Sequence, residues 1–185
     1  MTIRIDRSRY DAAPDFATYL GSVTKHAELW QALYRTATVS SEAIESMRGA
    51  AASVRLLVLS EDWCSDCFST VPIIARLAEN AGMDLRVLAR DANLDLMDAH
   101  LSSGTRSIPV IMALDGSCHV RSWWGPRPAA LQRWYRSDSL LLGSAERSRK
   151  KRAWYARDRG KTAVAEVLET VERAARRANS VVSGG

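Results

Sequence analysis

Long apolar runs are missing from this sequence of 185 residues, and no stretch approaches the roughly 20 residues that a transmembrane helix needs. The first ten residues hold three arginines and no apolar segment of the kind found in signal peptides, so secretion is not indicated. The chain has only three cysteines, an odd number that does not suit a framework of paired disulfides. We therefore expect a soluble, cytoplasmic protein with no membrane partner.

The apolar content is sufficient for one sizeable core with extensions, at 46% of residues, but not for two full domains. The net charge of +5 is unevenly spread along the chain. Residues 127–185 hold 14 Lys and Arg against 6 Asp and Glu, whereas residues 1–126 hold 12 against 15. The positive charge therefore belongs to a C-terminal extension rather than to the whole protein.

Two of the cysteines, Cys64 and Cys67, are separated by two residues where a strand is predicted to give way to a helix. Residues 54–59 form the short apolar run typical of a buried strand, and apolar residues recur at helical spacing from Phe68 to Ala78. The start of a helix stabilises a thiolate, so Cys64 is the expected nucleophile. Cys67, one helical turn later, is placed to displace a disulfide that Cys64 has formed.

A C-x-x-C pair has two other interpretations, half of a zinc site or a pair of core cysteines. A zinc site needs two further ligands, and the close downstream pair, Cys118 and His119, falls in a predicted strand whose successive side chains point to opposite faces. Polar and acidic neighbours disfavour burial on an apolar face. We therefore expect no metal ligands here and no cofactor.

The remaining pattern predicts further helices and strands around this segment. Residues 1–12 are expected to be a polar lead-in. Helices are predicted to begin near Pro14, Lys25 and Ser40, and another is predicted to run from Leu94 to near Ser103. Strands are predicted over residues 84–89, 110–114 and 117–123, the last two joined by a turn at Asp115-Gly116, and the tail after Pro128 is predicted to be helical.

This order of elements, with W-C-x-x-C after a strand and Ile-Pro before a hairpin, resembles the thioredoxin superfamily over residues 53–126. The run E-D-W-C-S-D-C is similar to that of a bacterial thioredoxin-like family. The resemblance implies an α/β, thioredoxin-like fold with a central mixed sheet flanked by helices. It divides the chain into a helical N-terminal extension over residues 1–52, a core over residues 53–126 and a basic helical extension over residues 127–185.

The resemblance also implies roles for individual residues. Trp63 matches the tryptophan before the nucleophile Cys64, Cys67 matches the resolving thiol, and Ile108-Pro109 matches the cis-proline pair. Pro109 lacks an N–H, which leaves the backbone of Ile108 free to pair with an extended substrate beside Cys64. We therefore expect Trp63, Ile108 and Pro109 to contact the substrate.

One departure concerns proton transfer. Thioredoxins carry a buried aspartate six residues before the first cysteine, and this chain has Val58 at that position. Without that acceptor, Glu61, Asp62 or Asp66, or water, would have to assist the deprotonation of Cys67.

A second departure is the dipeptide between the cysteines, Ser65-Asp66 in place of Gly-Pro. The charge of Asp66 in the first helical turn opposes formation of a thiolate at Cys64, whereas the helix dipole favours it. We therefore expect Ser65, Asp66 and Asp62 to modulate the chemistry.

The function that follows is a thiol–disulfide oxidoreductase that reduces a protein or small-molecule disulfide and depends on a reducing partner to recycle the dithiol. The alternative is a nucleic-acid or protein-binding module on the same fold. In that alternative, residues 147–159, which interleave basic and aromatic side chains, make the contact, and the dithiol is vestigial.

Overall fold

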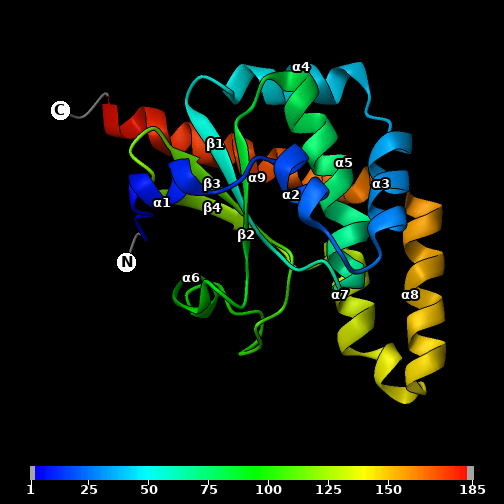
Figure 1. The fold of residues 1–185 in the computed structure, drawn as a ribbon. Coiled ribbons are helices and arrows are strands. Elements are labelled where there is room, and N and C mark those ends of the chain that lie inside the picture. The colour runs from blue at the N-terminus through cyan, green and yellow to red at the C-terminus, as the bar shows by residue number, and fades with distance from the viewer. Residues whose placement is uncertain (1–2, 183–185) are drawn as a thin grey trace.

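The computed structural model describes residues 3–182, so residues 1–2 and 183–185 of the two expected extensions lie outside it (Figure 1). Four helices precede the first strand: α1 (Arg7–Ala12), α2 (Phe16–Ser22), α3 (Ala27–Thr36) and α4 (Ser41–Ala50). The central part holds β1 (Val54–Ser60), α5 (Ser65–Ala81), β2 (Leu85–Ala89), α6 (Leu94–Asp98), β3 (Val110–Asp115) and β4 (Val120–Trp124). The last part is helical, with α7 (Ala129–Arg136), a 3-10 turn η1 (Asp138–Leu141), α8 (Ser144–Asp158) and α9 (Lys161–Val182).

The four strands form one mixed sheet in the order β2-β1-β3-β4. The strand β1 pairs in parallel with β2 and antiparallel with β3, and β3 pairs antiparallel with β4. The register places Val58 between Val87 and Ile111, all fully buried, because the two central strands are covered on both faces. The predicted α/β, thioredoxin-like fold with a mixed sheet is confirmed.

Helices α5 and α9 pack against each other, and α9 also contacts β1, β3 and β4 (Figure 1). The buried residues of α9 recur at intervals of three or four, as in Val167, Val171 and Ala174, which gives the helix one apolar stripe toward the sheet. Among the helices of residues 3–182, none is both long enough and apolar enough to cross a bilayer. The helices before β1 and after β4 share one continuous core with the sheet.

Half of the expected polar lead-in is a helix, because Arg7–Ala12 forms α1. The Asp6 carboxylate caps this helix by accepting a hydrogen bond from the N–H of Ser8. Tyr10 is fully buried, and its hydroxyl donates to the carbonyl oxygen of Leu56 at 3.3 Å. A six-residue helix is too short to show helical periodicity, so the packing of Tyr10 decides what the local sequence does not.

The hairpin between β3 and β4 also differs from the prediction, since β4 begins at Val120 rather than at Ser117. The carboxylate of Asp115 accepts hydrogen bonds from the N–H groups of Ser117 and His119, which holds a wider turn than Asp115-Gly116 alone. Cys118 lies in this turn with φ of 62° and is buried.

Helices α7 and α8 lie near the start of α5, and Figure 1 shows α7 below it and α8 to its right. Glu166 of α9 accepts a hydrogen bond from the Trp124 indole at 2.7 Å and another from the N–H of Ala129 at 2.9 Å. The end of β4 is therefore held next to the start of α7. This arrangement brings the chain after β4 toward the cysteine pair.

Candidate functional site

The cysteine pair lies where the sheet meets helix α5. Cys64 is the N-cap residue of that helix, and Cys67 lies in its first turn. Cys64 is 9% exposed, Cys67 is fully buried, and both are free thiols. Among residues 3–182, no further His, Cys, Asp or Glu joins them in a group of three that could hold a metal ion.

The pKa values of the two thiols are shifted in opposite directions. The pKa of Cys64 lies below its ordinary value, chiefly because the Cys67 side chain donates a hydrogen bond to its sulfur. Burial and the charge of Asp66 raise the pKa of Cys64 and offset part of this effect, while the N–H groups of Cys67 and Asp66 lower it further. The pKa of Cys67 lies well above its ordinary value, first because the thiol is completely buried and second because of its bond to Cys64. Cys64 is therefore the more acidic thiol of the pair.

The loop before β3 forms the other side of the site. The Cys64 thiol donates to the carbonyl oxygen of Ile108 at 3.6 Å, and the Ile108–Pro109 peptide bond is cis. Ile108, 3% exposed, lies beside Cys64, so the structure brings together the two segments that the sequence analysis associated.

Gly125 packs directly against this loop, and the sequence analysis did not identify it. A Cβ atom at Gly125 would lie 2.1 Å from the carbonyl oxygen of Pro109, and the backbone of Gly125 has φ of 141°. Both features require glycine. The available signal was the position of Gly125 between Trp124 and Pro126, directly after a strand.

A cavity of about 330 Å³ opens beside Cys64. Its lining residues are Trp63, Cys64, Ser65, Asp66, Arg90, Arg106, Ser107, Ile108, Arg127 and Lys151. Trp63 is 47% exposed, and the guanidinium of Arg90 lies 5.0 Å from the centre of its ring. The indole of Trp63 is partly exposed at the cavity wall, whereas Pro109 is buried and is not a lining residue.

Asp66 is buried rather than exposed in the first turn of α5, at 3% exposed. Its carboxylate lies 2.6 Å from the guanidinium of Arg127 and 3.1 Å from the ammonium of Lys151, and it accepts a hydrogen bond from the Tyr155 hydroxyl at 3.0 Å. Lys151 also donates to the hydroxyl of Ser65 at 2.9 Å. The negative charge next to Cys64 is thus compensated by two cations.

These partners of Asp66 come from parts of the chain that the sequence analysis did not connect with the dithiol. Arg127 follows β4, and Lys151 and Tyr155 lie one turn apart on α8, which places them on the same helical face. The signal in the sequence was this spacing of four within the basic run. The run alone does not reveal which of its members face inward.

Glu61 and Asp62, two of the candidate proton acceptors, have carboxylates bound elsewhere. Asp62 accepts hydrogen bonds from the N–H groups of Thr24 and Lys25, at 3.1 Å and 2.8 Å. Glu61 accepts from the N–H of Asp91 at 2.8 Å. Both residues therefore brace the turn that presents Cys64.

The polar side chain that contacts Cys67 is that of Ser60, not of Glu61 or Asp62. A hydrogen bond with the Ser60 hydroxyl lowers the pKa of Cys67, against the effect of burial. The hydroxyl of Tyr19 donates to Ser60 Oγ at 3.1 Å, and both side chains are buried. The sequence analysis missed both residues, and the signal for Ser60 was a polar residue at the end of an apolar strand.

Comparison with known proteins gives the same fold. A family model described as thioredoxin matches residues 13–146. A protein of unknown function from Pseudomonas aeruginosa has a solved structure that superposes with a TM-score of 0.69 at 21% identity, covering 89% of this chain and 95% of that chain. An HIV epitope scaffold superposes with a TM-score of 0.65, also at 21% identity, covering 91% of this chain and 98% of that chain. No curated protein matches.

The match to the family model extends over more than half of the chain, from α2 to the start of α8. A thioredoxin domain with an adjacent cysteine pair at the start of α5 is consistent with a redox function. The chain belongs to the thioredoxin superfamily.

Proposed function

We propose that this protein is a thiol–disulfide oxidoreductase that reduces a disulfide in a protein or small molecule. The observation that carries the proposal is the opposed acidity of the two thiols. Cys64, next to the substrate-accessible cavity, has a lowered pKa, and the buried Cys67 has a raised pKa. Only one of the pair is thus suited to attack an external disulfide.

The reaction proceeds in two exchanges. The Cys64 thiolate attacks one sulfur of the substrate disulfide, the substrate S–S bond breaks, and the departing sulfur leaves as a thiolate. The Cys67 thiol then loses its proton and attacks the Cys64 sulfur, which releases the second substrate sulfur as a thiolate. Through solvent, the two protons of the dithiol end on the two released substrate sulfurs. Two electrons pass from the dithiol to the substrate, and the Cys64–Cys67 disulfide is returned to the dithiol by an external thiol reductant.

The cavity residues give the substrate a place beside Cys64. The exposed ring of Trp63 offers an apolar contact on one side. The backbone at Ile108, before Pro109, is placed to pair with an extended substrate segment on the other. A reducing compartment such as the cytoplasm would supply the thiols that recycle the pair.

A single-turnover reaction with purified protein tests the proposal. The reduced protein is mixed with an excess of bis(2-hydroxyethyl) disulfide, quenched by alkylation and analysed by mass spectrometry. We expect wild type to form the Cys64–Cys67 disulfide. The Cys67→Ser variant should stop as a mixed disulfide on Cys64, because the resolving thiol is missing.

The Cys64→Ser variant is the matched control, since it keeps Cys67 and Cys118 but loses the proposed nucleophile. It should not react on the same time scale. Equal oxidation of wild type and Cys64→Ser would contradict the proposal.

The nucleic-acid alternative rests on residues 147–159, and several cations of this run have partners within the chain. Lys151 pairs with Asp66, Lys150 pairs with Glu146, and Arg147 donates to the carbonyl oxygen of Ser139. These contacts favour a role for the run in holding α8 next to the cysteine pair.

A further inference from the structure

The cavity beside Cys64 has a positively charged wall. Its charged lining residues among those the structure describes are four cations, Arg90, Arg106, Arg127 and Lys151, and one carboxylate, Asp66. The cations come from four separate places: the end of β2, the loop before Ile108, the chain after β4, and helix α8. The fold therefore gathers positive charge around the nucleophile that no local run of sequence would produce.

The inner part of this wall has an excess of positive charge. Arg127 and Lys151 share the single carboxylate of Asp66, and their side chains are only 10% and 12% exposed. One carboxylate balances one of the two cations. Charges at a partly buried site are screened less than at an open surface, so the uncompensated charge acts on a ligand in the cavity.

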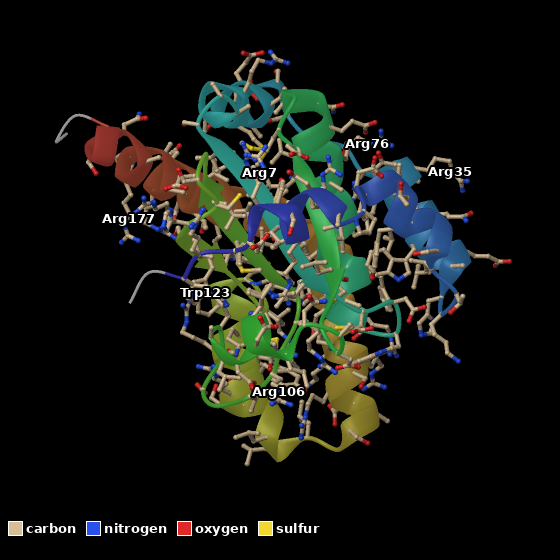
Figure 2. All side chains as sticks on the ribbon, turned by 60° about the vertical axis from the view of Figure 1, so that its left-hand side comes forward. Arg7, Arg35, Arg76, Arg106, Trp123 and Arg177 are labelled. Carbon is tan, nitrogen blue, oxygen red and sulfur yellow. The ribbon has the colours of Figure 1, made fainter. Side chains whose placement is uncertain are left out.

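The outer part of the wall is held in place by contacts around Trp63. The guanidinium of Arg90 lies over the Trp63 ring and donates to the carbonyl oxygen of Arg106 at 3.1 Å. It also pairs with the carboxylate of Asp91 at 2.7 Å, and Asp91 is not a lining residue of the cavity. The side chain of Arg106 is 50% exposed and is paired with Asp98, which is not a lining residue of the cavity. Figure 2 shows Arg106 at the same end of the molecule as α7 and α8. The two arginines form the rim of the cavity, and each is paired with a carboxylate that lies outside the cavity lining.

We propose that the disulfide reduced at Cys64 is anionic, with carboxylates close to its sulfur atoms. This inference rests on the proposed oxidoreductase function and adds the substrate class. Arg90 and Arg106 bind a carboxylate of the substrate as it enters. Arg127 and Lys151 stabilise the negative charge of the sulfur that leaves when the Cys64 thiolate breaks the substrate S–S bond. The electron and proton balance is that of the two exchanges described above.

Three small disulfides of matched size test the inference with the full chain. They are 3,3′-dithiodipropionate, a dianion, bis(2-hydroxyethyl) disulfide, which is neutral, and cystamine, a dication. The rate at which each oxidises the reduced protein is divided by its rate with 2-mercaptoethanol, which removes the intrinsic reactivity of the disulfide. We expect a normalised preference of about tenfold for the dianion over the dication, and this preference should fall as salt is added.

Variants locate the source of the preference. Arg106→Gln should reduce the ratio of dianion to dication rates about threefold, because it removes one cation from the rim. Arg35→Gln is the matched control. Arg35 is exposed on α3, and Figure 2 shows it far from Arg106, so this variant should keep the wild-type ratio.

A second arm separates peptides from small molecules as the source of the carboxylates, using cystine peptides flanked by aspartate or by lysine. A preference for the aspartate peptides supports an anionic protein segment, and a preference confined to the small dianion supports a small molecule. Equal normalised rates for the three small disulfides and for both peptides would overturn the inference and leave the oxidoreductase intact. Failure to reduce any of them would remove both proposals.

Discussion

The carboxylate of Asp66 lies 2.6 Å from the guanidinium of Arg127, and both side chains are almost completely buried. This ion pair joins the first turn of α5 to the chain that follows β4. Lys151 and Tyr155 complete the group from α8. Asp66 therefore acts on the charge at Cys64 and also joins α5 to the chain after β4 and to α8.

Asp66→Asn should lower the pKa of Cys64, because the charge of Asp66 raises that pKa and its loss leaves Arg127 and Lys151 uncompensated. A more stable thiolate favours the reduced form, so the reduction potential should rise. Titration of the ultraviolet absorbance of the thiolate checks the pKa, and equilibration with a glutathione buffer checks the potential. An unchanged or higher pKa would contradict the prediction.

The same variant should also cost stability, since it leaves two cations unpaired in a buried site. We expect a loss of about 3 kcal/mol in the free energy of unfolding, measured with urea. Asp11→Asn is the control, because Asp11 pairs with Arg7 at the open surface, where both side chains are more than half exposed. It should lose less than about 1 kcal/mol. Equal losses of unfolding free energy in the two variants would contradict the prediction, because the buried ion pair would then stabilise the protein no more than the exposed one.

The rate of attack by Cys64 on a neutral disulfide should depend on pH through the pKa of this thiol. Only the thiolate attacks, so the rate rises with pH and levels off above the pKa. Because the pKa of Cys64 is lowered, the midpoint should lie below that of an ordinary cysteine, about 8.5. A midpoint at or above the ordinary value would contradict this.

The main cause of that lowered pKa is the hydrogen bond from Cys67, which gives a direct test. Cys67→Ala removes the donor and should move the midpoint to higher pH. Cys67→Ser keeps a hydroxyl donor and should move it less. Stopped-flow measurement of the first exchange step in both variants checks the order.

Ser60→Ala should slow the second exchange, in which Cys67 loses its proton and attacks Cys64. The Ser60 hydroxyl lowers the pKa of Cys67, so its removal leaves this thiol even harder to ionise. We expect release of the mixed disulfide to be about tenfold slower at neutral pH, the value of one hydrogen bond of about 1.4 kcal/mol.

The first exchange in the same Ser60→Ala variant provides the internal control and should change little. Tyr19→Phe removes the hydroxyl that donates to Ser60 and should give a smaller effect in the same direction. Equal slowing of both exchanges would point to a structural disturbance instead of proton transfer.

Gly125→Ala should destabilise the protein and displace the loop of Ile108 and Pro109. The new Cβ atom would meet the carbonyl oxygen of Pro109 at 2.1 Å, and φ of 141° is strained for alanine. We expect a loss of about 2 kcal/mol in urea unfolding, together with slower reaction of Cys64. Gly116→Ala, where nothing lies within 4 Å, is the control and should change stability by less than about 0.5 kcal/mol. Similar effects of the two substitutions would contradict the prediction.

The strands and most helices were predictable because each has a local signature. Neighbouring residues are enough to identify the apolar run of β1, the N-cap at Ser40 and the helical spacing in α5. Helix α1 and the turn after Asp115 were not predicted, since they depend on contacts that the local pattern does not encode. Tyr10 donates to the carbonyl oxygen of Leu56, and the carbonyl oxygen of Cys118 in the turn accepts a hydrogen bond from the N–H of Ile5.

The sequence by itself determined the cysteine pair, its place at a strand-to-helix junction and the thioredoxin-like order of elements, because these features lie within a few residues of one another. Only the tertiary structure decided the surroundings of the pair. It buried Asp66 between Arg127 and Lys151, which are 61 and 85 residues away in the chain, and placed Ser60 against Cys67. The acidity and charge of the site depend on these distant contacts, because electrostatic interaction follows distance in space and burial, which sequence separation does not reveal.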